Sequence, residues 1–144
     1  MRTVLIRELL QEMDRNAALL EELGGVPRER FLSDPRIYLL AERCFQLAIE
    51  CLLDVCYSIA SSKRWPKPEE GAEAILLMGK EGVLPQDFAQ SIVGMAKFRN
   101  VLVHAYLRIN REIVREYLDK VGEFRTFARH VERFLDRESR AGER

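Results

Sequence analysis

A short stretch in the second half of the chain, KFRNVLVHAY at positions 97–106, carries the residue types best suited to chemistry. It contains His104, one of only two histidines, five residues after Arg99. A neutral imidazole with an unperturbed pKa of about 6.5 can accept a proton from a ribose 2′-hydroxyl near neutral pH. A guanidinium is always charged and forked, so it can stabilise negative charge that develops on a phosphorane-like transition state. The pair can therefore combine proton transfer with the binding of a negatively charged group.

Hydrophobic periodicity places this stretch on a helix. At roughly 100° per residue, residues 88–103 form one apolar stripe, and Arg99 falls near its middle, where a charge is costly unless it is paired. Asn100 and His104 are four residues apart and share a different face. The structural alternative is that Arg99 pairs with a core carboxylate or extends to solvent, and that Asn100 and His104 cap the helix. The stripe consists of Phe88, Ile92, Met95 and Leu102, with Phe98 at its edge.

The charge distribution supports a local anion site. The chain has 23 basic and 23 acidic residues, so it has no overall electrostatic bias toward nucleic acid. No acidic residue occurs between Phe88 and Arg111, however, and this window surrounds His104. Its other basic residues, Lys97, Arg108 and Arg111, are weaker candidates for contacts with substrate phosphates.

The segment FRNVLVHAY, with Arg99, His104 and Tyr106 in an Arg-x4-His-x-Tyr arrangement, resembles the HepT-type toxins of the HEPN superfamily. The long helical segment LLAERCFQLAIECLLDVCYSIASS upstream, then an intervening helix and a turn, supports this resemblance. The resemblance extends from residue 1 to about residue 135. The resemblance implies a metal-independent RNA endonuclease, the toxin of a type II/VII-like toxin–antitoxin system. Arg99 and His104 would be catalytic, while Asn100 would orient the imidazole or bind phosphate.

The resemblance also implies a modification and a partner. In the family, the tyrosine that matches Tyr106 receives adenylate groups from a cognate MNT-type nucleotidyltransferase antitoxin, which silences the toxin. The alternative for Tyr106 is an aromatic wall residue at a helix end. The family requires no cofactor and no metal ligand set.

The resemblance further implies a homodimer with the site in a groove at its interface. If the helix persists through His104, one chain cannot direct both Arg99 and His104 into one narrow cleft. Either the helix unwinds near Val103, or two chains supply the residues across a two-fold axis. We expect the interface to include the surroundings of Met95 and Arg99, with the long upstream helix possible as a second contributor.

A second class of function competes with the enzyme. The chain could be a non-catalytic, HEPN-like dimeric binding module that docks a nucleotidyltransferase or a nucleotide. Arg99, Asn100 and His104 favour the enzyme, because a pure interaction bundle gains nothing from a desolvated arginine. A plain helical adaptor is the third interpretation.

The elements that position these residues are predicted to be helical throughout. The fold expected is all-α, an up-and-down bundle of four main helices plus a short helix, in one HEPN-like domain over residues 1–144. The segment 26–34 is expected to be a linker, and residues 136–144 a frayed tail. Helices are predicted over residues 2–24, 69–79, 85–104 and 111–137. The long second helix is predicted to run from a cap at Ser33 or Asp34 to about Ser62.

Within the long second helix, two features concern the environment of the site. Glu50 and Asp54 lie four residues apart on one face. The pair could be a ligand or acid site, but a solvated edge or a partner for Arg99 is favoured. The three cysteines, Cys44, Cys51 and Cys56, are expected to be buried free thiols. Free thiols are typical of a reducing cytoplasm.

Three further features bear on surroundings and compartment. Trp65 lies in the loop that follows the long second helix, where it either covers the core or stacks on a ligand; its amphipathic character favours cover. There is no signal segment, and no apolar run approaches about 18 residues. We therefore expect a cytoplasmic protein with no membrane segment.

Overall fold

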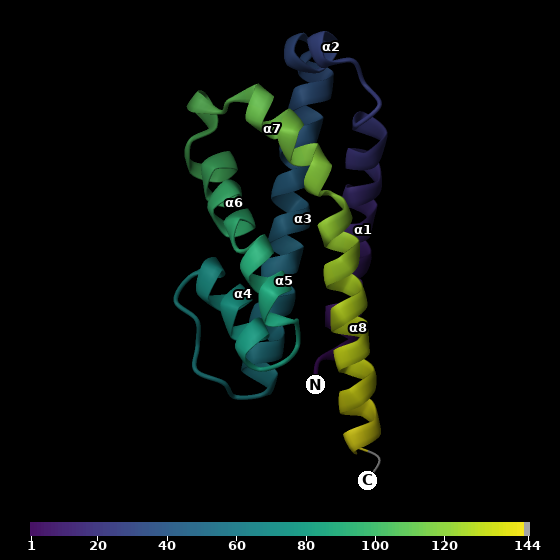
Figure 1. Ribbon diagram of the computed structural model, residues 1–144, viewed down its shortest axis with the longest axis vertical. Helices are drawn as coiled ribbons and strands as arrows, with labels where there is room; N and C mark the ends of the chain where they lie inside the picture. Colours follow the sequence, from purple (N-terminus) through teal and green to yellow (C-terminus); the bar gives the residue numbers. More distant parts are fainter. Residues whose placement is uncertain (143–144) are drawn as a thin grey trace.

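The computed structural model describes residues 1–142, and every regular element in that part of the chain is a helix (Figure 1). This confirms the predicted all-α class. Its longest helices, α1, α3 and α8, run lengthwise through the molecule, and shorter helices cover one side of α3. The elements are α1 (Thr3–Leu23), α2 (Arg28–Ser33), α3 (Pro35–Ser62), α4 (Gly71–Lys80), α5 (Gln86–Ile92), α6 (Gly94–His104), η1 (Tyr106–Arg108), α7 (Arg111–Tyr117), η2 (Leu118–Lys120) and α8 (Gly122–Gly142).

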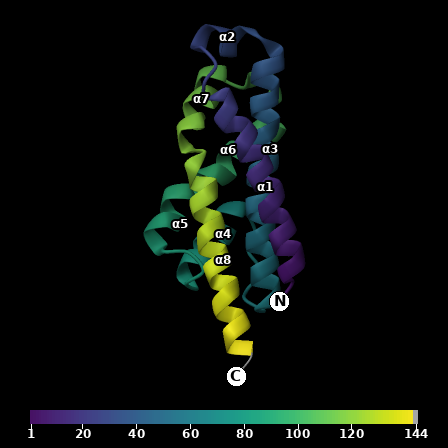
Figure 2. The same cartoon turned by 90° about the vertical axis from the view of Figure 1, so that its right-hand side faces the viewer.

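Helix α3 is the centre of the bundle. Its start follows the predicted signals, because the Asp34 side chain accepts a hydrogen bond from the Arg36 N–H at 3.0 Å and Pro35 occupies the first turn. Helix α1 packs along it and α8 packs against α1, whereas α4 and α6 contact α3 from the other side (Figures 1 and 2). Residues are buried around much of its circumference, including all three cysteines, which are free thiols.

By length and composition alone, α3 could cross a membrane. The expectation that no apolar segment reaches that size was therefore too strict, because isolated charges do not disqualify a window. In the most apolar 18-residue stretch of α3, 61% is buried inside the bundle. The core helix of a soluble protein can be as long and as apolar as this, so length and composition alone are weak evidence for a membrane segment.

Two helices predicted as continuous are each divided. The predicted helix over 85–104 is interrupted at Val93, which separates α5 from α6. The predicted helix over 111–137 is interrupted by η2, just before Gly122. Glycine is a poor helix former, and Gly94 and Gly122 each begin the helix after the break. The breaks let α5 pack on α4 while α6 packs on α3, and let α7 cross α3 while α8 follows α1.

Two further predictions were wrong at the ends of elements. The expected linker contains the short helix α2, which forms because Phe31 is completely buried against the core. The segment expected to fray from residue 136 is helical through Gly142. It follows the buried Leu135, and its Glu138 contacts Lys63, the residue after α3, at 2.9 Å. Residues 143–144 lie outside the described part of the chain.

An aromatic cluster fixes α6 against the rest of the bundle. The Phe98 ring stacks on Tyr117 with ring centroids 3.9 Å apart, and meets Phe45 of α3 edge-on at 5.4 Å. Phe45 also meets Tyr117 edge-on at 5.6 Å. Because Phe98 directly precedes Arg99 on α6, this cluster sets the rotation of α6 that turns Arg99 toward α3.

The close approach of α4 and α5 gives a stability prediction. A Cβ atom on Gly79 would stand 2.8 Å from the Cβ of Ala89, which is too close. We expect Gly79→Ala to lower the free energy of unfolding by about 1–3 kcal/mol in urea denaturation, because overpacking outweighs the helix propensity of alanine.

Gly122→Ala is the matched control, since no atom lies within 4 Å of its added Cβ. It should raise the free energy of unfolding by about 0.4–1 kcal/mol by restricting the unfolded chain. Equal effects of the two substitutions would show that the α4–α5 contact is looser than described.

Candidate active site

Arg99 is half-buried between α6 and α3, with 29% of its side chain exposed. Its Nη2 donates to Glu50 Oε1 at 3.3 Å, and its Nη1 donates to Asn100 Oδ1 at 3.1 Å. Glu50 is itself oriented by Gln46, whose Nε2 donates to the same carboxylate oxygen at 3.2 Å. The structure thus selects one of the sequence alternatives, in which Glu50 is a partner of Arg99.

A cavity of about 190 Å³ opens beside this ion pair. Helix α4 closes one side of it, because Gly71 approaches α3 and α6 closely. A Cβ atom there would lie 3.1 Å from the methyl groups of Leu53 and 3.2 Å from Ala96. The lining residues are Glu50, Leu53, Asp54, Tyr57, Gly71, Ala96, Arg99 and Asn100.

The window without acidic residues is not free of acidic neighbours in space. Helix α3 brings Glu50 and Asp54 to the cavity that Arg99 lines. Burial, followed by the charge of Glu50, raises the pKa of the Asp54 carboxyl above its ordinary value, and Arg99 partly opposes this shift. Burial also raises the pKa of Tyr57. The positive charge of the site is therefore smaller than the sequence alone indicates.

The guanidinium of Arg99 keeps hydrogen-bonding capacity in this arrangement. It carries five N–H donors. Within residues 1–142 the guanidinium donates two hydrogen bonds, to Glu50 and Asn100, and its Nε is buried with no hydrogen-bond partner. Donors of the outer nitrogens remain for a ligand in the cavity.

His104 is the last residue of α6, and its side chain is exposed. No ion pair or hydrogen bond to it is found within the described chain. Because α6 is helical through His104, the unwinding considered near Val103 does not occur. Five residues correspond to a rotation of roughly 140°, so Arg99 faces α3 while His104 faces outward. A single chain does not bring these two side chains together.

Tyr106 begins the short helix η1, two residues beyond His104, and is 68% exposed. Its neighbour Leu107 is 86% exposed, and Val101 on α6 is also exposed, so apolar surface surrounds His104. Met95, in contrast, is 1% exposed. The chain's own core covers the Met95 side chain. The interface expected in the surroundings of Met95 and Arg99 stays a prediction.

The weaker phosphate candidates separate in space. Lys97 and Arg108 are exposed on α6 and η1. Arg111 is engaged elsewhere: its guanidinium lies 3.7 Å from the centroid of the Tyr38 ring, and its Nη1 donates to the Leu32 carbonyl at 3.1 Å. Arg111 thus attaches the start of α7 to α2 and α3.

Sequence reasoning missed Tyr57 and Gly71 as parts of this cavity. Tyr57 could have been found, since it follows Glu50 by seven residues and Asp54 by three on the same face of α3. Gly71 gave no such signal, because its role depends on how α4 packs. The second histidine, His130, lies on α8 against the Phe88 ring, with ring centroids 5.3 Å apart.

Within residues 1–142, no group of three or more His, Cys, Asp or Glu side chains could hold a metal ion. The cysteines are also unsuited to reactivity as thiolates. Burial raises the pKa of Cys51 to about 11, and it raises the pKa of Cys44 and Cys56 as well.

Comparison with known proteins places this architecture. The fold is shared with the tri-AMPylated HEPN toxin of Shewanella oneidensis in complex with MNT antitoxin, at a TM-score of 0.81 and 18% identity, covering 89% of this chain and 96% of that one. It is also shared with YutE from Bacillus subtilis, a cytosolic protein of unknown function, at a TM-score of 0.82 and 18% identity, covering 96% and 93%. The described chain thus has the fold of these two proteins.

Sequence comparison defines the family. The family described as ribonuclease HepT-like matches residues 13–133. Over 103 residues, 72% of this chain and 70% of the relative, the sequence is 28% identical to the tRNA nuclease HepT of Aphanizomenon flos-aquae (strain 2012/KM1/D3). The chain belongs to the ribonuclease HepT-like family, which confirms the resemblance carried by the Arg-x4-His-x-Tyr segment.

The raised pKa of Asp54 gives a pH-dependent prediction. The folded state holds this proton more tightly than the unfolded state, so stability falls as the pH rises above the ordinary value of 3.8. Asp54→Asn should therefore raise Tm at pH 7, and the gain should vanish below pH 3.8, where Asp54 is neutral in both states.

Thermal unfolding followed by circular dichroism measures this effect. Asp119→Asn, at an exposed position on η2, is the control for removing one carboxylate. A lower Tm for Asp54→Asn at pH 7 would mean that attraction to Arg99 exceeds the effect of burial.

Proposed function

We propose that this chain is a metal-independent RNA endonuclease, the toxin of a toxin–antitoxin system. The observation that carries the proposal is the state of the two motif residues. Arg99 is held by Glu50 and Asn100 with donors to spare, and His104 on the same helix is exposed and without a partner in the described chain. The tRNA nuclease and the toxin among the similar proteins support the same activity.

The mechanism follows from the chemistry of these side chains. Neutral His104 takes the proton of a ribose 2′-hydroxyl, and the freed oxygen attacks the adjacent phosphorus. Arg99 donates hydrogen bonds to the phosphate oxygens as negative charge increases on them. The bond to the 5′ oxygen breaks, the leaving oxygen takes up a proton from water, and a 2′,3′-cyclic phosphate remains. Asn100, which already bonds Arg99, fixes the orientation of the guanidinium.

In our proposal the working site needs two chains. Since α6 directs Arg99 and His104 to different sides, a cleft that uses both is completed by His104 of a second copy across a two-fold axis. The exposed apolar side chains near His104, Val101, Tyr106 and Leu107, supply area for such an interface. The exposed Leu39 on α3 gives a second place where a partner could pack.

We further propose that a nucleotidyltransferase antitoxin of the MNT type silences this toxin at Tyr106 in the cytoplasm. The phenolic oxygen of Tyr106 would attack the α-phosphorus of ATP, lose its proton and release pyrophosphate. The exposure of Tyr106 leaves it open to an enzyme, and adenylate phosphate so close to His104 would compete with RNA for cationic groups. The AMPylated toxin among the similar structures supports this assignment.

The binding-module alternative makes use of the same ion pair. The contact of Glu50 with Arg99 would also fasten α6 to α3 in a protein that only docks a nucleotidyltransferase or a nucleotide. Catalysis by the variants described next separates the two functions.

Purified His104→Ala should lose RNA cleavage by at least about 100-fold, since it removes the proton acceptor. Arg99→Ala should lose a similar factor, and Arg99→Lys should recover little because lysine lacks the planar fork. Cleavage by the unmodified chain should persist in EDTA. The assay is gel separation of labelled RNA fragments, with folding checked by circular dichroism.

His130→Ala is the matched control, because it removes the only other histidine at a position on α8. It should retain cleavage. Full activity of His104→Ala, or loss of cleavage in EDTA, would contradict the assignment.

Tyr106→Phe should escape silencing, because it keeps the ring and lacks the acceptor oxygen. After incubation with the cognate nucleotidyltransferase and ATP, intact-mass spectrometry should find adenylate on the unmodified chain and none on this variant. Tyr38→Phe is the control for loss of another tyrosine hydroxyl. Equal adenylate addition to wild type and Tyr106→Phe would place the modification elsewhere.

A further inference from the structure

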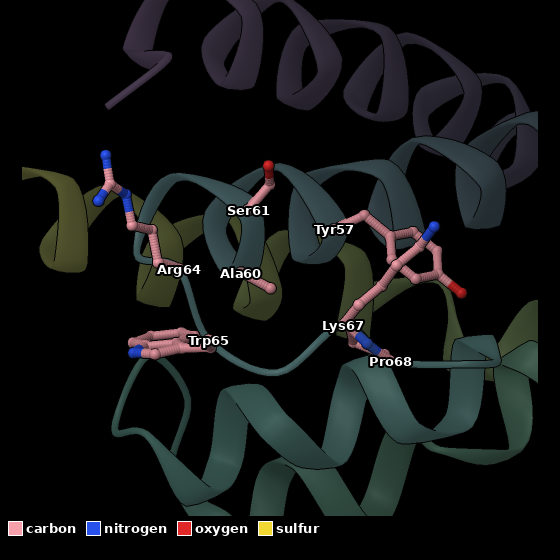
Figure 3. A pocket seen from close by; sticks show the side chains of 7 residues that line it. All are labelled: Tyr57, Ala60, Ser61, Arg64, Trp65, Lys67 and Pro68. Carbon is pink, nitrogen blue, oxygen red and sulfur yellow. The ribbon is translucent and has the colours of Figure 1, made fainter.

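We propose that a second cavity, at the end of α3, binds a nucleotide of the RNA strand that extends from the cleavage site. The source of the nucleotide rests on the proposed function, whereas the binding chemistry rests on the cavity itself. The cavity lies between the last turns of α3 and the loop that follows them (Figure 3).

The shape of this cavity suits a planar ligand. Its volume is about 490 Å³, within the range of about 300–1,000 Å³ typical of small-ligand sites. Arg64 and Trp65 stand at one end and Tyr57 and Lys67 at the other, with the short side chain of Ala60 between them (Figure 3). Aromatic rings at both ends can stack on a base, and stacking accepts any base because every base has a π-face.

The charge of the lining selects an anion. Two cations, Arg64 and Lys67, line the cavity, and no carboxylate does. Neither cation forms an ion pair or side-chain hydrogen bond within residues 1–142. The preceding Lys63 differs, because it contacts Glu138 of α8 at 2.9 Å. The two cavity cations are therefore available for phosphate groups, and the combination of cations with aromatic rings fits a nucleotide.

The backbone at Arg64 is an independent observation. The N–H of Trp65 donates to the Ala60 carbonyl at 3.0 Å, and the N–H of Arg64 donates to the Ser61 carbonyl at 3.2 Å. This is the helix-ending turn in which glycine is the usual residue at the position of Arg64. Arg64 has a φ of 57°, the one positive φ outside glycine in the described chain. Arg64 thus keeps a long cationic side chain at a position where glycine would adopt this backbone at lower cost.

The cavity shares a lining residue with the proposed active site. Tyr57 lines both this cavity and the one beside Arg99 and Asn100. Along α3, the residues that line the two cavities run from Glu50 to Ser61. These two residues are eleven positions apart, which is roughly 16 Å along the helix. A strand of a few nucleotides can therefore lie with its scissile phosphate at Arg99 and a flanking base between Trp65 and Tyr57. Such readout requires an unpaired base, so the substrate class is single-stranded RNA or a loop.

Trp65 is the only tryptophan of the chain, so intrinsic fluorescence reports directly on this cavity. The inactive His104→Ala chain should be titrated with a single-stranded RNA of about twelve nucleotides, enough to reach from one site to the other. We expect saturable quenching of the Trp65 emission. Adding Arg64→Gly should weaken binding by about tenfold and lower the slope of log affinity against log salt by about one.

Arg64→Gly separates a binding role from a structural one, because glycine suits this backbone. Its Tm should be equal or higher, so weaker binding cannot be attributed to unfolding. If its Tm falls, Lys67→Ala decides, and it should weaken binding and lower the salt slope in the same way. Lys80→Ala, at an exposed lysine on α4 outside the cavity, is the charge-matched control and should leave both unchanged.

Three results would overturn the proposal: no quenching by RNA, unchanged affinity in both Arg64→Gly and Lys67→Ala, or AMP alone binding as tightly as the RNA, which would make this a mononucleotide site. The nuclease proposal is tested separately by cleavage with the active chain. Cleavage without quenching would remove the flanking site and keep the enzyme. Quenching without cleavage would keep the nucleotide site and remove the enzyme.

Discussion

An arginine in the apolar stripe of α6 would be costly to bury alone, and the bundle offsets that cost by placing Glu50 of α3 3.3 Å away. The rest of the site depends on this ion pair. It holds the site helix against the central helix, directs the guanidinium into a cavity between α3, α4 and α6, and leaves the opposite side of α6 free for His104. The aromatic cluster around Phe98 keeps α6 in the rotation that the ion pair requires.

This constraint separates the two motif residues, and the separation shapes the functional account. A helix that continues through His104 cannot return the imidazole to Arg99 within one chain. Exposed apolar side chains beside His104, and an exposed tyrosine two residues later, give that end of the molecule the properties of a contact surface. A site shared between two copies reconciles the fixed Arg99 with the exposed His104. It also places Tyr106, the proposed point of control, where a partner enzyme can reach it.

Sequence patterns predicted the parts that depend on local chemistry. The helical class and the buried cysteines follow from spacing and side-chain type. The cap, left between Ser33 and Asp34, is Asp34, and one of the alternatives for Glu50, a partner for Arg99, is the one observed. The breaks before Gly94 and Gly122 were not predicted, because the hydrophobic period continues across both. Each glycine was a signal for a break, but the new direction of the helix depends on packing. The short helix α2 depends on one buried side chain, Phe31. The acidic neighbours of the basic window come from α3, about fifty residues away in the chain.

The central claim, a site built from Arg99 of one chain and His104 of another, can be tested with two inactive variants. Arg99→Ala and His104→Ala carry different affinity tags, are produced together, and the heterodimer is isolated through both tags. If the site is shared, one of the heterodimer's two active sites contains an intact Arg99 and an intact His104. Cleavage should therefore recover to about half of the wild-type rate per dimer. A pure heterodimer with no more activity than either variant alone would contradict the account.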